Sequence, residues 1–164
     1  MKAKSIFLIM VAVLAFTIGC GNTLAKKGRT VRATDFELKT IDDQTIRLSD
    51  YSGKVILLNF FATWCPPCLM EMPAFNEMSM EYKGALEVIA VNVGREPLSK
   101  VREFALANNL QFTIAMDDGK VSKLYGPIRG IPVTVIIDKD FNIAKKYIGA
   151  RPKAVFVKDI EKLL

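Results

Sequence analysis

The sequence contains no histidine and only three cysteines. Without histidine the chain cannot build Cys-His or Ser-His-Asp catalytic groups, a histidine-ligated zinc site or a Cys-x-x-Cys-His haem attachment. Structural zinc takes four ligands, so the pair Cys65 and Cys68 alone cannot complete such a site. The chemistry of the cysteines themselves is therefore what the sequence leaves to explain.

Charge is missing from one stretch near the N-terminus. Residues 6–18 hold no charged side chain, follow Lys2 and Lys4, and are followed at once by Gly19-Cys20-Gly21. A basic start, a short apolar run and a small residue before the cleavage point are typical of an export signal. A helix over this run would span roughly 20 Å against about 30 Å of hydrocarbon, so it is too short to cross a bilayer comfortably.

The segment Thr17-Ile18-Gly19-Cys20 resembles the lipobox of bacterial lipoproteins, in which the cysteine becomes the acylated first residue. Its first position departs from that pattern, where leucine is usual. We expect residues 1–19 to be a signal peptide and Cys20 to be lipidated. Residues 20–34 would then be a tether that holds the protein on a membrane, facing the periplasm or the cell exterior. Cleavage after Thr23-Leu24-Ala25, which would give a soluble exported protein, and an uncut anchor remain open.

Basic residues outnumber acidic ones, 23 to 17, for a net charge of +6. The excess is mild and is not gathered into a patch of the nucleic-acid-binding type, so no nucleic-acid partner is expected. Four of the basic residues lie beside the expected anchor: Lys26, Lys27, Arg29 and Arg32. There each could add about 1 kcal/mol of attraction to anionic lipid. A solubilising linker explains them equally well.

Patterns of apolar residues along 35–164 predict one α/β domain. Alternation on both sides of Asp42-Asp43 indicates an N-terminal hairpin. Three segments are apolar on both faces, as buried central strands are: 55–61, 87–93 and 133–137. The other expected elements are helices over about 66–83 and 97–110, a strand over 112–116, a strand over 143–148 and a final helix over 153–164. Hairpins at both ends make the expected sheet mixed, with helices flanking it.

With Cys20 assigned to lipidation, Cys65 and Cys68 remain as a pair. A disulfide that closes only two intervening residues removes little chain entropy, so reactivity explains the pair better than stability does. Cys65 would lie where a buried strand ends and a helix begins, and free N–H groups there favour the attacking thiolate. Cys68, one turn on, could resolve the mixed disulfide. Pro66 and Pro67 suit a first helical turn. A zinc half-site and a structural disulfide stay open.

The segment from Asn59 to Cys68, NFFATWCPPC, resembles the active-site segment of thioredoxin-like proteins, above all the exported TlpA/ResA-type branch. Pro73 matches the proline that kinks the thioredoxin active-site helix. The segment from Tyr125 to Pro132 is similar to the one that ends in the thioredoxin cis-proline. The helix and strand expected between Pro97 and Met116 resemble the insertion of the TlpA/ResA branch.

This resemblance covers residues 35–164 and implies a thioredoxin-like fold with an N-terminal β-hairpin and a central helix-strand insertion. It implies a thiol–disulfide oxidoreductase that needs no bound cofactor and acts on the thiols or disulfides of client proteins. Electrons would come from a membrane thiol-transfer donor. The resemblance also implies a reducing role, for example in cytochrome c maturation.

The resemblance assigns roles around the cysteines as well. The peptide bond before Pro132 is expected to be cis and to face the disulfide, where the Ile131 backbone would bind an extended client segment. A proline that only starts a strand is the alternative. Trp64, with Pro66 and Pro67, is expected to form surface that contacts clients, although packing explains Trp64 nearly as well.

Glu71 lies three residues past Cys68 on the same side of the expected helix, where ResA-type proteins carry an active-site glutamate. Asn59 stands where thioredoxin has a buried aspartate, so the usual proton acceptor is missing and Glu71 is its substitute. Burial beside a thiolate would raise the Glu71 pKa toward the range useful for acid–base catalysis. An ordinary solvated helix charge is the alternative.

Two other activities on this fold compete with thiol–disulfide exchange. Sco-type copper chaperones use cysteines with three intervening residues and a distant histidine, and this sequence has neither feature. Peroxiredoxins place a threonine three residues before the cysteine, whereas Thr63 precedes Cys65 by two. A copper site could also be sought in the methionines at 70, 72, 78 and 80. Methionines in one helix more often fill core gaps or form a soft surface, so no metal is expected.

The substitution Cys20→Ala tests the lipid anchor. Metabolic labelling with a palmitate analogue should mark the wild-type protein and leave the variant unlabelled, because Cys20 is the residue that follows Gly19 in the lipobox. Label on Cys20→Ala, or a mature N-terminus at Lys26, would contradict the prediction.

Overall fold

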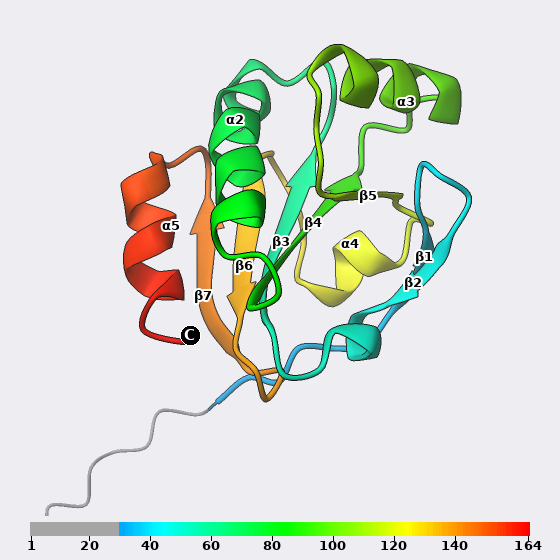
Figure 1. Ribbon diagram of the computed structural model, residues 1–164. Coiled ribbons are helices and arrows are strands. Elements are labelled where there is room, and N and C mark those ends of the chain that lie inside the picture. The colour runs from blue at the N-terminus through cyan, green and yellow to red at the C-terminus, as the bar shows by residue number, and fades with distance from the viewer. Residues whose placement is uncertain (1–29) are drawn as a thin grey trace, which may run out of the picture.

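The computed structural model describes residues 30–164 (Figure 1). A five-stranded sheet forms the centre, in the order β5-β4-β3-β6-β7. Its strands are β3 (Val55–Phe61), β4 (Leu86–Asn92), β5 (Thr113–Met116), β6 (Val133–Ile137) and β7 (Ile143–Ile148). β3, β4 and β5 run parallel, whereas β6 is antiparallel to β3, and β7 to β6. The predicted mixed sheet is confirmed.

The central strand β3 is buried along its whole length. All seven of its residues are buried, and successive side chains point to opposite faces of the sheet. Leu57 and Phe61 belong to the core on one face, and Leu58 and Phe60 to the core on the other. Cover on both faces is the reason that this strand reads as a continuous apolar run. The strand gives the loop that follows Phe61 a firm support.

Three helices cover one face of the sheet: α2 (Pro66–Glu81), α3 (Leu98–Ala107) and α5 (Lys153–Ile160). Figure 1 shows α2 and α5 side by side in front of the sheet. Phe75 of α2 contacts Phe156 of α5, with ring centroids 5.4 Å apart. The buried face of α2 carries Cys68, Glu71, Met72, Phe75 and Met78, which fits the predicted helical spacing. Ser79 and Tyr82, further along the predicted helix, are only half-buried, because the packed stripe runs through Met78.

The opposite face carries the predicted N-terminal hairpin, β1 (Glu37–Lys39) and β2 (Thr45–Arg47). Leu38 of the hairpin is buried in the core on this face. Two short elements beside it were not predicted: the 3-10 helix η1 (Leu48–Tyr51) and the helix α4 (Val121–Leu124). Each is four residues long, too short for a helical pattern to show in the sequence.

The predicted insertion forms as α3 and β5, and β5 extends the sheet by pairing in parallel with β4. α3 ends at Ala107, earlier than predicted, and Asn109 just beyond it adopts a left-handed backbone with φ of 49°. The final helix α5 likewise ends at Ile160 rather than at the C-terminus. Both helices therefore end earlier than the apolar pattern predicted.

The predicted signal peptide, Cys20 and the tether as far as residue 29 lie outside the described residues. Within residues 30–164, no helix has both the length and the apolar character needed to span a bilayer.

Candidate active site

A disulfide between Cys65 and Cys68 lies where β3 gives way to α2. Their Cα atoms are 5.3 Å apart. Cys65 keeps 4% of its surface exposed and Cys68 keeps none. A large client can therefore reach the sulfur of Cys65 only.

Cys65 is the N-cap residue of α2, as the sequence predicted. The backbone N–H of Cys68 points at the Cys65 sulfur, with 3.3 Å between nitrogen and sulfur. Pro66 and Pro67 occupy the first helical turn, where the missing N–H groups cost no helical hydrogen bond. In the reduced protein, the remaining N–H groups and the helix macrodipole favour the Cys65 thiolate over the thiol.

The peptide bond between Ile131 and Pro132 is cis, as the resemblance implied. The carbonyl oxygen of Ile131 lies 3.8 Å from the Cys65 sulfur. Pro132 is buried, and its own carbonyl accepts a hydrogen bond of 2.8 Å from the N–H of Gly149. The loop after β7 thus fixes the cis-proline loop, which brings the Ile131 backbone up to the disulfide.

Exposed apolar side chains surround the opening above Cys65. Trp64 is 60% exposed, so much of its indole ring faces solvent. Pro66 and Pro67 are exposed as well. Leu69 and Met70, neither of which was expected to contact clients, are 36% and 78% exposed on the next turn of α2. Large exposed apolar side chains in one place are typical of a surface that contacts another polypeptide.

Glu71 is 2% exposed, so it is a buried carboxyl rather than a solvated helix charge. Its Oε1 accepts a 2.8 Å hydrogen bond from the backbone N–H of Arg151. Among residues 30–164, no group pairs with its Oε2. Desolvation raises the pKa of Glu71 to about 7, against the opposing effects of the Arg151 N–H and guanidinium. The carboxyl therefore lies on the buried face of α2, one turn from Cys68, and titrates near neutral pH.

Asn59 is fully buried in the middle of β3. Its amide nitrogen donates a 2.9 Å hydrogen bond to the hydroxyl of Thr134 on the neighbouring strand. A carboxamide does not ionise near neutral pH, so Asn59 cannot act as a carboxylate does. Glu71 is thus the buried carboxyl of α2.

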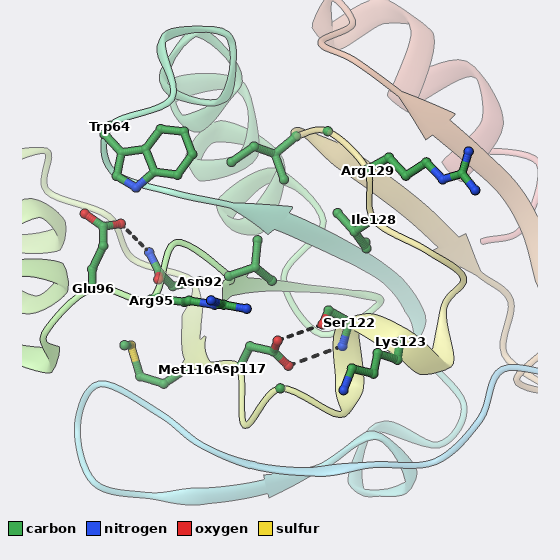
Figure 2. Close-up of a pocket in the computed structure, with 14 residues that line it drawn as sticks. Trp64, Asn92, Arg95, Glu96, Met116, Asp117, Ser122, Lys123, Ile128 and Arg129 are labelled. Atoms are coloured by element: carbon green, nitrogen blue, oxygen red, sulfur yellow. Dashed lines mark hydrogen bonds between the residues drawn. The ribbon is translucent and has the colours of Figure 1, made fainter.

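A second buried carboxylate, Glu96, supports the loop before Cys65, and sequence reasoning missed it. Its side chain is 5% exposed and pairs with Lys100 at 2.9 Å. It accepts hydrogen bonds from the Thr63 hydroxyl and from the Thr63 N–H at 2.8 Å. It accepts another from the Asn92 amide at 2.9 Å (Figure 2). Desolvation raises the pKa of Glu96, but these hydrogen bonds outweigh it and lower the pKa to about 2. No local sequence pattern marks this contact, because 33 residues separate Thr63 from Glu96.

Gly94 allows the loop that carries Glu96 to approach Ala62 and Trp64 closely. A Cβ at Gly94 would lie 2.6 Å from a Glu96 carboxylate oxygen, 2.8 Å from the Ala62 Cβ and 3.0 Å from the Trp64 indole nitrogen. Only a residue without a side chain fits there. The loop after β4 therefore sets the position of Trp64.

The methionines considered for copper do not converge on one place. Met72 and Met78 are buried in the core, whereas Met70 and Met80 are exposed. Across the part of the chain that the structure describes, no three His, Cys, Asp or Glu side chains come close enough to bind a metal ion.

Comparison with known sequences agrees with a thioredoxin-like site for thiol–disulfide exchange. The chain matches the AhpC/TSA family over residues 30–146. It is 37% identical over 162 residues to the thiol-disulfide oxidoreductase ResA of Geobacillus thermodenitrificans (strain NG80-2), covering 96% of this chain and 92% of the relative. It is 39% identical over 124 residues to the thioredoxin-like protein YneN of Bacillus subtilis (strain 168), covering 74% and 72%.

Solved structures agree in fold. A thioredoxin-family thiol:disulfide interchange protein of Chlorobium tepidum TLS matches 84% of this chain and 98% of its own, with a TM-score of 0.74 and 27% identity. The exposed lipoprotein thioredoxin of Streptococcus pneumoniae strain TIGR4 matches 79% and 100%, with a TM-score of 0.65 and 29% identity. The chain therefore belongs to the AhpC/TSA family and is a thioredoxin-like thiol-disulfide oxidoreductase of the ResA type.

Proposed function

We propose that this protein reduces disulfides of exported client proteins, with Cys65 as the attacking group, Cys68 as the resolving group and Glu71 as the proton acceptor. One observation carries the proposal. Cys65 alone is reachable, and beneath it α2 buries both Cys68 and a carboxyl whose pKa is raised to about 7.

In the first step, the Cys65 thiolate attacks one sulfur of a client disulfide. A new disulfide forms between Cys65 and the client, and the other client sulfur leaves as a thiolate that takes up a proton. The start of α2 supports this step because its N–H groups and macrodipole stabilise the attacking anion.

In the second step, the Cys68 thiol gives its proton to the Glu71 carboxylate and attacks the Cys65 sulfur. The client leaves with its second sulfur reduced, and the Cys65–Cys68 disulfide forms, so two electrons have passed from the protein to the client. A carboxyl with a pKa near 7 is half-ionised at neutral pH, which suits it to accept this proton and return it later. Its Oε2, which has no partner in the described residues, is the oxygen available for the exchange.

The client contacts would come from the surface around Cys65. The Ile131 backbone beside cis-Pro132 would bind an extended client segment, and Trp64, Pro66 and Pro67 would cover its side chains.

The cycle needs a reductant to reopen the disulfide, and we propose a membrane thiol-transfer protein as that donor. Cytochrome c apoproteins with a disulfide between their paired cysteines are the clients that we propose.

The site of action would be the outer face of a membrane, with the protein held by a lipid on Cys20. The Gly19-Cys20 lipobox supports this proposal. The similar structure from Streptococcus pneumoniae is described as that of an exposed lipoprotein. A peroxidase role has less support, because the Thr63 hydroxyl donates to Glu96 and so is not directed at Cys65.

Cys68→Ala should accumulate mixed disulfides between Cys65 and client proteins, because the resolving thiol is gone. Cys65→Ala should trap far fewer, since Cys68 is fully buried. Non-reducing gels and mass spectrometry of purified protein would measure both. Wild-type protein should reduce insulin and consume little peroxide. Equal trapping by the two variants would contradict the assigned roles.

Glu71→Gln should slow the resolving step about tenfold or more at neutral pH, because it removes the proton acceptor but keeps the shape of the side chain. The rate at which the Cys65 mixed disulfide resolves should then no longer follow the ionisation of a group with a pKa near 7. Glu77→Gln, an exposed position on the same helix, is the matched control. Superimposable pH profiles for wild type and Glu71→Gln would make Glu71 a bystander.

The same substitution tests the raised pKa through stability. The folded protein holds the Glu71 proton up to about pH 7, whereas the unfolded chain releases it near the ordinary value of 4.5. Stability from this group is therefore fully present below that value and is lost as the pH rises toward 7. Oxidised Glu71→Gln should melt at a higher temperature than wild type above neutral pH and at the same temperature below about pH 4.

The reducing direction predicts a low reduction potential for the Cys65–Cys68 couple. A reductant must lie well below the roughly −120 mV of a strong periplasmic oxidant and nearer the roughly −270 mV of thioredoxin. Each ~30 mV corresponds to about 1.4 kcal/mol for two electrons, so this gap decides the direction of flow. Equilibration with glutathione and dithiothreitol buffers gives the value. A potential close to that of the strong oxidant would make the protein a disulfide donor.

A further inference from the structure

A groove of about 510 Å³ opens beside the redox centre and continues away from it. Trp64 and Ile131, which border the Cys65 opening, also line the near end of the groove. The loop 93–96 after β4 forms one wall, and the segment 117–123 around α4 forms the other (Figure 2). A client chain bound along Ile131 would therefore extend into this groove.

The two carboxylates of the groove are already engaged by the protein. Glu96 accepts hydrogen bonds from Thr63 and Asn92 and pairs with Lys100. Asp117 accepts from the Ser122 N–H at 3.2 Å and from the Ser122 hydroxyl at 2.8 Å (Figure 2). The Glu96 carboxylate is thus balanced by Lys100, and the Asp117 carboxylate oxygens are held by Ser122 in the wall of the groove.

The groove also carries three basic side chains. Arg95, Lys123 and Arg129 line it and are exposed. Across residues 30–164, none of the three takes part in an ion pair. Figure 2 shows the Arg95 side chain extending into the middle of the groove, whereas the Arg129 guanidinium points away from its centre. The charge that remains available to a bound chain is positive, and Arg95 presents it most directly.

The backbone holds Arg95 in this position from both sides. Gly94 before it packs against Trp64 and Ala62, and Glu96 after it is fixed by its hydrogen bonds. Arg95 itself has a left-handed backbone, with φ of 55°, which is uncommon for a residue with a side chain. Half-buried Met116 and Ile128 add apolar surface beside it. A guanidinium next to apolar surface suits a side chain that has methylene groups and a terminal carboxylate.

We infer that this groove is a specificity subsite, in which Arg95, assisted by Lys123, binds an acidic side chain of the client a few residues from the client cysteine that joins Cys65. The inference rests on the proposed function, because it concerns the client of that reaction. An ion pair at the border of the contact distinguishes clients and speeds their encounter more than it adds affinity. The protein would thus prefer disulfides flanked by Asp or Glu and disfavour those flanked by Lys or Arg.

The test uses short peptides with a single cysteine, activated as a mixed disulfide with thionitrobenzoate. Attack by the Cys65 thiolate joins the peptide sulfur to Cys65 and releases coloured thionitrobenzoate, and Cys68 then frees the peptide. Three matched peptides carry Glu, Gln or Lys two residues before the cysteine, and a second set carries them two residues after it. We expect the second-order rate constant of reduced wild-type protein to fall from Glu to Gln to Lys in at least one set, by about threefold to fivefold per step. The preference should weaken as salt is added.

The preference is measured as the ratio of the Glu-peptide to the Gln-peptide rate constant within each variant. Arg95→Gln should bring this ratio close to one, and Arg95→Glu should bring it below one. Lys158→Gln removes the same charge from an exposed position on α5, away from the groove, and should keep the wild-type preference. Equal rates for the three peptides in both sets, or a preference that survives Arg95→Gln, would overturn the subsite and leave the proposed function standing. No thionitrobenzoate release from any peptide would instead overturn the proposed function, and the subsite with it.

Discussion

The start of helix α2 is the point on which the chemistry of this protein depends. The backbone N–H of Cys68 in its first turn points at the Cys65 sulfur from 3.3 Å and also donates a 3.0 Å hydrogen bond to the Cys65 carbonyl. This arrangement needs a strand that ends at a fixed place and a helix that begins there. β3 provides the first because it is buried on both faces, and packing of Phe75 and its neighbours holds the second. The fold thus places Cys65 where its thiolate would be stabilised in the reduced protein, at one end of the rigid central sheet.

Two buried glutamates show how surroundings divide one chemical group into two roles. Glu71 and Glu96 are both almost inaccessible to solvent. Glu71 receives one backbone hydrogen bond, which does not offset desolvation, so its pKa rises to about 7. Glu96 receives hydrogen bonds from Thr63 and Asn92 and an ion pair with Lys100, and its pKa falls to about 2. The first can therefore move a proton at neutral pH, and the second keeps a permanent charge that holds the active-site loop.

The surface around Cys65 is assembled from loops that are tied to one another. The loop after β7 holds the cis-proline loop through Gly149 and the Glu71 carboxyl through Arg151. The loop after β4 holds Thr63 through Glu96 and sets the place of Trp64 through Gly94. The proposed client-binding surface and the Glu71 carboxyl thus share the same supports. In such an arrangement, a client side chain bound in the proposed subsite beside Trp64 would also position the client next to the Cys65 sulfur.

The sequence by itself determined the reactive pair, the buried strands, the N-terminal hairpin and the family. These features are written in local patterns: two cysteines at a strand–helix junction, continuous apolar runs, and alternation on both sides of Asp42-Asp43. The burial of Glu71 could be expected from its spacing to Cys68 and from the family resemblance. Only the tertiary structure decided which groups surround it. The contact of Arg151 with Glu71 spans 80 positions of the chain, and that of Glu96 with Thr63 spans 33. Such contacts form when separate loops meet at one edge of the sheet, and no periodicity in the chain records them. The groove at Arg95 has the same origin, because its walls come from loops that become neighbours only after folding.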